Sequence, residues 1–217
     1  MKTIELDIPV DRTHSVQADL SVPENARSLV IFSHGSGSSR FSSRNKAVAE
    51  ALNKKNMATL LADLLTPEED NVYENRFNID LLTKRLIAVT EYTRRLRSTE
   101  NLPAGYFGAS TGAASALRAA VALEDHIRAV VSRGGRADLA SDVLEKLTAP
   151  TLLIVGSLDT EIIDLNERAY KKLSCLKSIE IIKEATHLFE EPGKLEEVAE
   201  LASGWFSKHL LPHSALV

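Results

Sequence analysis

Apolar and polar side chains alternate at the start of the chain. Residues 4–10 and residues 16–22 each place an apolar side chain at every second position. This period of two is the pattern of a strand with one buried face and one exposed face. Two such segments in succession predict an antiparallel pair of strands.

The pattern changes after Ser28, where short runs of consecutive apolar residues follow one another. Such runs are typical of parallel strands that are buried on both faces, and the segments between them have a helical period. The runs cover residues 29–32, 58–62, 104–107, 129–131, 152–155 and 179–182. The helical segments include Ile79 to Arg97, Lys194 to Leu211 and a short helix at about residues 139–147. The pattern therefore predicts an α/β fold with about eight strands, mostly parallel apart from the first pair, and helices on both faces of the sheet.

The length and composition agree with one globular domain over residues 1–217. A chain of 217 residues with 44% hydrophobic residues can bury a large core, and no repeat or linker-like stretch divides it. The 26 basic and 30 acidic residues give a net charge of −4, and aromatic residues make up 5%. An acidic chain with few aromatic side chains is unsuited to binding nucleic acid, where cationic and stacking side chains supply the affinity.

No segment of the sequence predicts insertion into a membrane. No stretch has ~18 consecutive apolar residues, and the first residues lack the apolar centre of a signal peptide. We therefore expect a cytoplasmic protein. Cys175 is the single cysteine, so no internal disulfide and no multi-cysteine metal site is expected. The exposed edge of the first strand pair is a candidate surface for a homodimer.

The candidate chemistry lies after three of the apolar runs, because functional residues of an α/β sheet gather beyond the carboxyl ends of its parallel strands. The segment Gly108–Gly112, with Ser110 at its centre, follows one run and precedes a segment rich in alanine. A G-x-S-x-G turn between a strand and a helix lifts a serine hydroxyl above the sheet as a nucleophile. The alternative interpretation is a tight turn whose small residues only allow close packing of the helix.

A serine nucleophile needs a base to remove its proton, and the base needs a carboxylate that orients it. In hydrolases of this architecture the acid and then the histidine follow the serine along the chain. Asp159 follows the fifth apolar run and His187 follows the sixth, so both lie just past a strand end in that order. Glu161 and Asp164 are competing acids, but they fall inside the next helix. Asp159 has an alternative role as the N-cap of that helix.

A loop rich in glycine and serine, from His34 to Ser39, follows the first buried run. Acyl transfer passes through a tetrahedral oxyanion, which backbone N–H groups stabilise. One donor is expected at Thr111, the residue after the nucleophile, and the other in this loop at Ser36. A dinucleotide-binding loop is the alternative, because the loop begins a G-x-G-x-x-G pattern, although its third glycine position holds Arg40.

These motifs resemble the α/β-hydrolase superfamily, and most closely its dienelactone hydrolase-like branch. The resemblance covers nearly the whole chain. It implies a nucleophile, an acid and a base at Ser110, Asp159 and His187, and two oxyanion donors at Ser36 and Thr111. Members with a segment like Ser132–Arg136 are sometimes fused to phosphoribosyltransferase domains. The chain departs from true dienelactone hydrolases in one respect, since they carry a cysteine where it has Ser110.

The neighbourhood of the candidate site is open and rich in arginine. The segment between the runs at residues 129–131 and 152–155 is too short for a lid domain, so we expect no lid and a small, water-soluble substrate. Arg40 and Arg133 lie past strand ends and are candidates to bind a carboxylate or phosphate of the substrate. Arg44 and Arg136 are placed similarly. Each of these arginines has an alternative role as a solvated or salt-bridged loop residue.

The sequence thus predicts a serine hydrolase that cleaves the carboxylic ester of a small acyl substrate through an acyl-enzyme, without a metal or an organic cofactor. Thioesterase and lactonase activities use the same oxyanion chemistry and stay open. The alternative from another class is a non-catalytic binding module with the hydrolase fold, for which a broken triad would be the sign.

Overall fold

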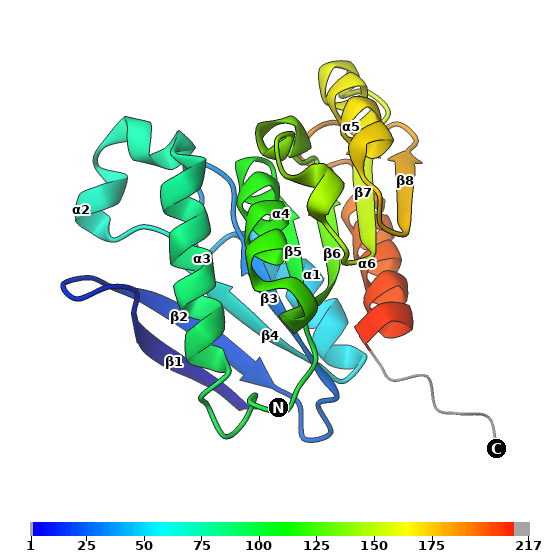
Figure 1. Ribbon diagram of the computed structural model, residues 1–217. Helices are drawn as coiled ribbons and strands as arrows, with labels where there is room; N and C mark the ends of the chain where they lie inside the picture. The colour runs from blue at the N-terminus through cyan, green and yellow to red at the C-terminus, as the bar shows by residue number, and fades with distance from the viewer. Residues whose placement is uncertain (1, 211–217) are drawn as a thin grey trace.

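An eight-stranded sheet forms the centre of the molecule (Figure 1). The computed structural model describes residues 2–210. The strands are β1 (Lys2–Pro9), β2 (Ser15–Val22), β3 (Ser28–Ser33), β4 (Met57–Ala62), β5 (Ala104–Ala109), β6 (Ile127–Arg133), β7 (Thr151–Gly156) and β8 (Lys177–Ile182). They lie in the order β1-β2-β4-β3-β5-β6-β7-β8. The pairs β1–β2 and β2–β4 are antiparallel and the other pairs are parallel, which confirms the predicted sheet.

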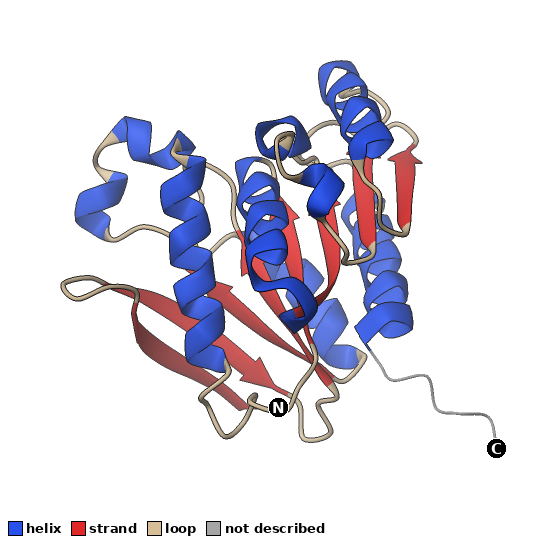
Figure 2. Ribbon diagram, viewed as in Figure 1, coloured by secondary structure: helices blue, strands red, loops and turns tan. Residues whose placement is uncertain are grey.

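Helices cover both faces of this sheet (Figure 2). The α-helices are α1 (Ser43–Lys54), α2 (Pro67–Asp70), α3 (Ile79–Thr93), α4 (Thr111–Leu123), α5 (Thr160–Lys172) and α6 (Lys194–Leu210). The 3-10 turns are η1 (Tyr73–Phe77), η2 (Glu124–His126), η3 (Ala137–Ala140) and η4 (Leu144–Lys146). Buried side chains of α3, α4 and α5 share one core with the sheet, and those of α1 and α6 share the other. The consecutive apolar runs follow from these two cores, because every side chain of β3, β4, β5 and β7 is buried.

The alternating pattern of the first two strands has the opposite cause. In β2, Val16, Ala18 and Leu20 are buried against the α3 side, while the residues between them are partly exposed. The strand pair therefore has one covered face and one face in contact with solvent. β1 lies at the edge of the sheet.

Two of the predicted helices differ in the structure. The segment at residues 139–147 forms the turns η3 and η4 instead of an α-helix, because Ser141 and Asp142 separate two short buried stretches and favour turns. The helix predicted to reach Arg97 ends as α3 at Thr93, where the Thr93 hydroxyl donates to the carbonyl oxygen of Thr90 and competes with the helical pattern. The predicted end of the last helix at Leu211 lies outside the described residues.

A segment between β4 and α3 lies at the end of the sheet where the central strands finish (Figure 1). Here α2 begins with a capping box, in which Thr66 and Glu69 each accept a hydrogen bond from the other's backbone N–H. Glu69 also binds the guanidinium of Arg85 on α3. Asp70 and Arg76 line a small cavity together with the loop from His34 to Gly37. The segment therefore flanks one side of the loop expected to hold an oxyanion donor.

No helix within residues 2–210 has the length and apolar character needed to cross a membrane. In the same part of the chain, no cluster of three or more His, Cys, Asp or Glu side chains could hold a metal ion.

Candidate active site

Ser110 lies in the sharp turn between β5 and α4. Its backbone has φ 51° and ψ −124°, a positive φ that is rare for a residue with a side chain. The turn brings α4 close to β3: a Cβ at Gly112 would lie 2.2 Å from the carbonyl oxygen of Ser33, so only glycine fits there. Ser110 occupies the N-cap position of α4, but its side chain makes no capping hydrogen bond with the helix. The hydroxyl is thus left available for another role.

Asp159 and His187 are in direct contact. Asp159 Oδ2 lies 2.6 Å from His187 Nδ1, and the side chains are 15% and 37% exposed. Asp159 stands at the N-cap position of α5, yet its side chain makes no capping hydrogen bond and binds the histidine instead. The competing acids Glu161 and Asp164 are exposed on α5. A neutral imidazole that donates from Nδ1 to this carboxylate keeps a lone pair on Nε2.

Hydrogen bonds fix the loop that carries His187. Glu191 Oε1 accepts from the backbone N–H and from the hydroxyl of Thr186, at 3.2 and 2.5 Å. The hydrogen bond from the Thr186 hydroxyl is the main cause that lowers the pKa of Glu191 below its ordinary value, and the bond from the backbone N–H adds to it. The carboxylate therefore stays ionised at neutral pH. The backbone N–H of Leu158 donates to the carbonyl oxygen of Ala185 at 2.9 Å. The loop after β8 is therefore tied to the loop that holds Asp159.

The loop after β6 connects Ser110 with His187. The backbone N–H of Ser110 donates to the carbonyl oxygen of Arg133 at 3.2 Å, and the N–H of Arg136 donates to that of Ser110 at 3.0 Å. Gly134, between them, lies against the imidazole: a Cβ added there would be 3.4 Å from both Nδ1 and Cε1 of His187. Gly134 also has a positive φ of 52°. One short loop thus holds the backbone of Ser110 and supports the ring of His187.

The loop after β3 packs against Ser110 from the other side. A Cβ added at Gly35 would be 3.0 Å from Cβ and 3.8 Å from Oγ of Ser110. The next residue, Ser36, donates its backbone N–H to Oγ1 of Thr111 at 2.9 Å. Thr111 is the first residue of α4, and its own N–H has no acceptor inside the helix. In this structure the Ser36 N–H is therefore bonded to Thr111, while the Thr111 N–H has no partner inside the helix.

His34 holds this loop in place. Its Nε2 accepts from the backbone N–H of Leu64 at 3.1 Å, so Nδ1 carries the proton and donates to the carbonyl oxygen of Gly35 at 2.9 Å. Burial lowers the pKa of His34 below 6.5, because the cationic form would lose its hydration. His34 is thus a neutral structural residue next to the candidate site.

The arginines singled out in the sequence have different surroundings. Arg40 is bonded to Asp63 and Glu5 at 2.9 and 2.8 Å, and its Nε lies 3.5 Å from Asp19. These carboxylates belong to β1, β2 and the end of β4, so Arg40 joins its loop to the sheet and is not free to bind a substrate. Arg136 binds Asp138 beside it, and Arg44 binds the exposed Glu190. Arg133 differs from the others because no carboxylate pairs with it within the described residues.

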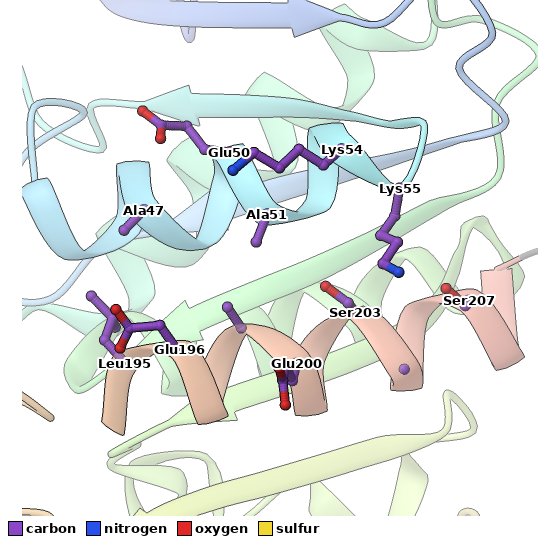
Figure 3. Close-up of a pocket in the computed structure, with 12 residues that line it drawn as sticks. Ala47, Glu50, Ala51, Lys54, Lys55, Leu195, Glu196, Glu200, Ser203 and Ser207 are labelled. Atoms are coloured by element: carbon purple, nitrogen blue, oxygen red, sulfur yellow. The ribbon is translucent and has the colours of Figure 1, made fainter. Parts of the chain in front are cut away.

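A larger cavity lies elsewhere on the surface. It is a groove of about 680 Å³ between α1 and α6 (Figure 3). Small side chains, among them Ala47 and Ala51 of α1 and Ser203 of α6, line its walls, and Glu50, Lys54 and other charged residues stand at its rim. None of its lining residues belongs to the loops that hold Ser110, Asp159 or His187. None of the three candidate catalytic residues lines the groove, so its size does not make it the candidate active site.

Comparison with known proteins identifies the family. No protein-family model matches the chain. The chain is 46% identical to a dienelactone hydrolase from Anabaena variabilis ATCC 29413, whose crystal structure superposes with a TM-score of 0.93 over 96% of this chain and 98% of that one. The chain belongs to the dienelactone hydrolase family. It therefore has the α/β-hydrolase fold, as the resemblance of its motifs predicted.

More distant hydrolases share the fold of this dienelactone hydrolase family member. Est1E from Butyrivibrio proteoclasticus is 19% identical with a TM-score of 0.82, and covers 94% of this chain and 98% of its own. An esterase from Pyrococcus furiosus is 15% identical with a TM-score of 0.80, over 96% of this chain and 92% of its own. At these identities the likeness shows the fold alone.

Two longer proteins match the chain in sequence. They come from Mycobacterium tuberculosis strains CDC 1551 and H37Rv, are 54% identical over 195 residues, and are provisionally named phosphoribosyl transferases. The match covers 90% of this chain but 44% of each of those proteins. The chain therefore spans less than half the length of these relatives.

Sequence reasoning missed several residues that shape the site. The roles of Gly134, Thr186 and Glu191 depend on how the loops after β6 and β8 meet, which their place in the sequence does not show. The contact of Asn45, on α1, with Arg133 could not be predicted from the sequence either. A separation of 88 residues between Asn45 and Arg133 leaves no signal in a single sequence.

Proposed function

We propose that the chain is a serine hydrolase that cleaves a carboxylic ester of a small substrate. The observation that carries the proposal is the 2.6 Å contact between Asp159 and His187, with the imidazole resting on the same loop that bonds the backbone of Ser110. In this role Asp159 holds the proton on Nδ1, and Nε2 of His187 removes the proton of the Ser110 hydroxyl.

Each step of the reaction uses a group described above. The Ser110 oxygen attacks the acyl carbon as His187 takes its proton, and the carbonyl oxygen becomes an oxyanion. The backbone N–H of Thr111 stabilises that charge, and the N–H of Ser36 joins it by exchanging its hydrogen bond to Thr111 Oγ1 for one to the oxyanion, with about 3 kcal/mol or more for each donor. The tetrahedral intermediate expels the alcohol, which receives the proton from His187, and leaves an acyl-enzyme. Water, deprotonated by the same imidazole, then releases the acid and restores Ser110. These steps require neither a metal nor an organic cofactor.

A lactone is a second candidate substrate. The relative from Anabaena variabilis is named a dienelactone hydrolase, and a lactone is a cyclic ester that opens through the same oxyanion. Thioesters would also react through these steps. The serine at position 110 is compatible with ester, lactone and thioester substrates. Compared with a cysteine it changes only the nucleophile, and the acid, the base and the oxyanion donors stay the same.

The name of the Mycobacterium tuberculosis relatives refers to proteins of which more than half lies outside the match. We assign the hydrolase activity to the part represented by this chain. The phosphoribosyl transferase activity that their name states would then reside in the remaining part. This assignment is tested by measuring both activities on the present chain, for which we expect ester hydrolysis alone.

Labelling and substitution test the nucleophile and the base. A fluorophosphonate should label the protein with a stoichiometry of one, and peptide mapping should place the label on Ser110. Ser110→Ala and His187→Ala should each lower turnover of a short p-nitrophenyl ester by at least about 10³-fold. His126→Ala, at an exposed position, is the matched control and should keep the wild-type rate. A labelled residue other than Ser110, or wild-type rates in both alanine variants, would refute the proposal. Side-by-side assays of esters, thioesters and lactones then rank the substrate classes.

A further inference from the structure

Arg133 is a buried cation without a counter-ion. Arg133 is 6% exposed and is the last residue of β6. Its side chain lies on the face of the sheet that α1 and α6 cover. Within residues 2–210 its guanidinium makes one hydrogen bond, from Nη2 to Oδ1 of Asn45 on α1 at 3.4 Å, and no ion pair. Its Nε is buried and has no acceptor. The guanidinium lies 5.9 Å from the centre of the Phe189 ring.

Two other arginines show how this protein normally treats a covered guanidinium. The side chain of Arg85 is 6% exposed and binds Asp11 and Glu69. The side chain of Arg40 is 11% exposed and is surrounded by three carboxylates. Burial of a charge is costly unless an opposite charge or hydrogen bonds replace its hydration. Arg133 departs from this pattern, although it is covered to the same degree.

The surroundings of Arg133 add positive charge. Burial, and then the nearby Arg44, lower the pKa of Arg133 to about 10, so it remains a cation at neutral pH. Arg44 and Asn45 lie in the first turn of α1, a twelve-residue helix without an acidic residue in that turn. The positive end of the helix dipole therefore points toward the same region. The exposed Glu190 is bonded to Arg44 and not to Arg133.

This region adjoins the proposed catalytic residues. The carbonyl oxygen of Arg133 accepts from the backbone N–H of Ser110, and the next residue, Gly134, supports the ring of His187. Phe189, beside the guanidinium, is two residues after His187. On the other side, α1 directly continues the loop that contains Ser36. The unpaired cation thus lies between the loop of the proposed base and the helix that follows the proposed oxyanion loop.

We propose that Arg133, with Arg44 and Asn45, forms an anion-binding subsite beside His187 that takes a carboxylate or phosphate group. The two Nη groups of a guanidinium present a planar pair of donors that matches two oxygens of either group. Asn45 contributes an amide in the same place, and Arg44 attracts the anion from the partly exposed edge. The proposal extends the proposed function, because it makes an ester with a second, anionic group the preferred substrate. A free anion such as inorganic phosphate shares this chemistry and is the other source of the ligand.

The first experiment measures binding without any turnover. Inorganic phosphate is added to the full chain in a phosphate-free buffer of constant ionic strength, and thermal unfolding and calorimetric titration are recorded. We expect phosphate to raise the unfolding temperature of the wild type and of Arg133→Lys, but not of Arg133→Met. Arg44→Met should weaken the response. Arg128→Met is the matched control, because Arg128 is exposed at the other end of the same strand, and it should respond like the wild type.

The same variants separate a ligand site from a packing role. Without phosphate, Arg133→Met should be at least as stable as the wild type, because a buried unpaired charge is replaced by an apolar chain of similar length. A structural role predicts the opposite, a loss of stability in the absence of phosphate. Equal phosphate responses of the wild type and Arg133→Met, or no response of the wild type, would overturn the proposal. If Arg133→Met does not fold, the responses of Arg133→Lys and Arg44→Met decide the question.

The second experiment identifies the source of the anion. The value of kcat/KM is measured for three kinds of ester. The uncharged reference is p-nitrophenyl butyrate, and the mono-p-nitrophenyl ester of succinate carries a carboxylate on the acyl side. The third kind carries a carboxylate on the alcohol side. A substrate subsite predicts that the wild type prefers one anionic series and that Arg133→Met reduces this preference by about tenfold or more. Phosphate binding that depends on Arg133 without such a preference supports the subsite with a free anion as its ligand. Absence of all ester turnover, with no labelling of Ser110, would refute the proposed function and leave the phosphate experiment to decide the subsite.

Discussion

The backbone N–H of Ser36 is directed at the side chain of Thr111, whose Oγ1 accepts its hydrogen bond at 2.9 Å. The bond joins the loop after β3 to the first residue of α4. It holds two segments, 75 residues apart in the chain, on either side of Ser110. In the free protein the proposed Ser36 donor is thus held next to Thr111 by this bond, which the Ser36 N–H must exchange for the oxyanion during the reaction.

Removal of this hydroxyl should therefore impair catalysis more than stability. Thr111→Val keeps the shape of the side chain but removes the bond that holds the Ser36 loop beside Ser110 in the free protein. We expect kcat for an ester to fall by about tenfold, in line with the free energy of one hydrogen bond, with little change in KM. Thr111→Ser retains the acceptor and should stay close to the wild type. Steady-state kinetics check this, and equal rates for the valine and serine variants would contradict it.

A side chain at position 134 should displace the loop that carries His187. Gly134→Ala places a Cβ 3.4 Å from the ring and 3.2 Å from the backbone oxygen of His187, at a positive φ. We expect kcat/KM to fall by at least about tenfold, since small displacements of a catalytic group cost large factors in rate. Gly193→Ala is the matched control: it has a positive φ of 82° but nothing within 4 Å of the added Cβ. Both variants should lose about 1 kcal/mol of stability from backbone strain, measured by urea unfolding, and only Gly134→Ala should lose activity.

The sheet could be predicted from the sequence because the two kinds of apolar pattern have simple physical causes. Strands covered on both faces, such as β5, must be apolar throughout, whereas β2 has one covered face and alternates. The turns at residues 137–146 could not be predicted in this way. Their buried residues Ala137, Ala140 and Leu144 have a helical spacing, and the local preference of Ser141 and Asp142 for turns outweighs it.

The residues of the proposed triad could be named from the sequence because each follows a strand that the pattern locates. The surroundings of the arginines could not. Arg133 is the last residue of β6 and Arg40 lies in the loop after β3, yet Arg40 is neutralised by carboxylates of three other segments and Arg133 by none. This difference depends on contacts between distant segments, which a motif does not record.

Asp159 is expected to act on the tautomer of His187 and hardly on the fold. Asp159→Asn replaces an acceptor by an amide that can donate to Nδ1, which would move the proton to Nε2 and remove the base. We predict a loss of up to about 10⁴-fold in kcat. Because Asp159 makes no capping hydrogen bond with α5, the free energy of unfolding should change by no more than about 1 kcal/mol. Asp164→Asn, on the exposed face of the same helix, serves as the control and should be fully active.

The buried His34 should make the protein less stable in mild acid. Its pKa is lowered by burial in the folded state, so below about pH 6.5 the unfolded chain binds a proton that the folded chain does not. Its contribution to stability is therefore fully present above pH 6.5 and is lost as the pH falls, by at most about 1.4 kcal/mol for each pH unit. His34→Gln, which cannot titrate, should remove this component, although it also weakens the bond to Leu64 and lowers stability at every pH. The test is urea unfolding of both proteins from about pH 8 to about pH 5, with the exposed His126→Gln as a control. The difference in unfolding free energy between the wild type and His34→Gln should shrink as the pH falls. A constant difference would contradict the prediction, because it would show that His34 is protonated in the folded protein as readily as in the unfolded chain.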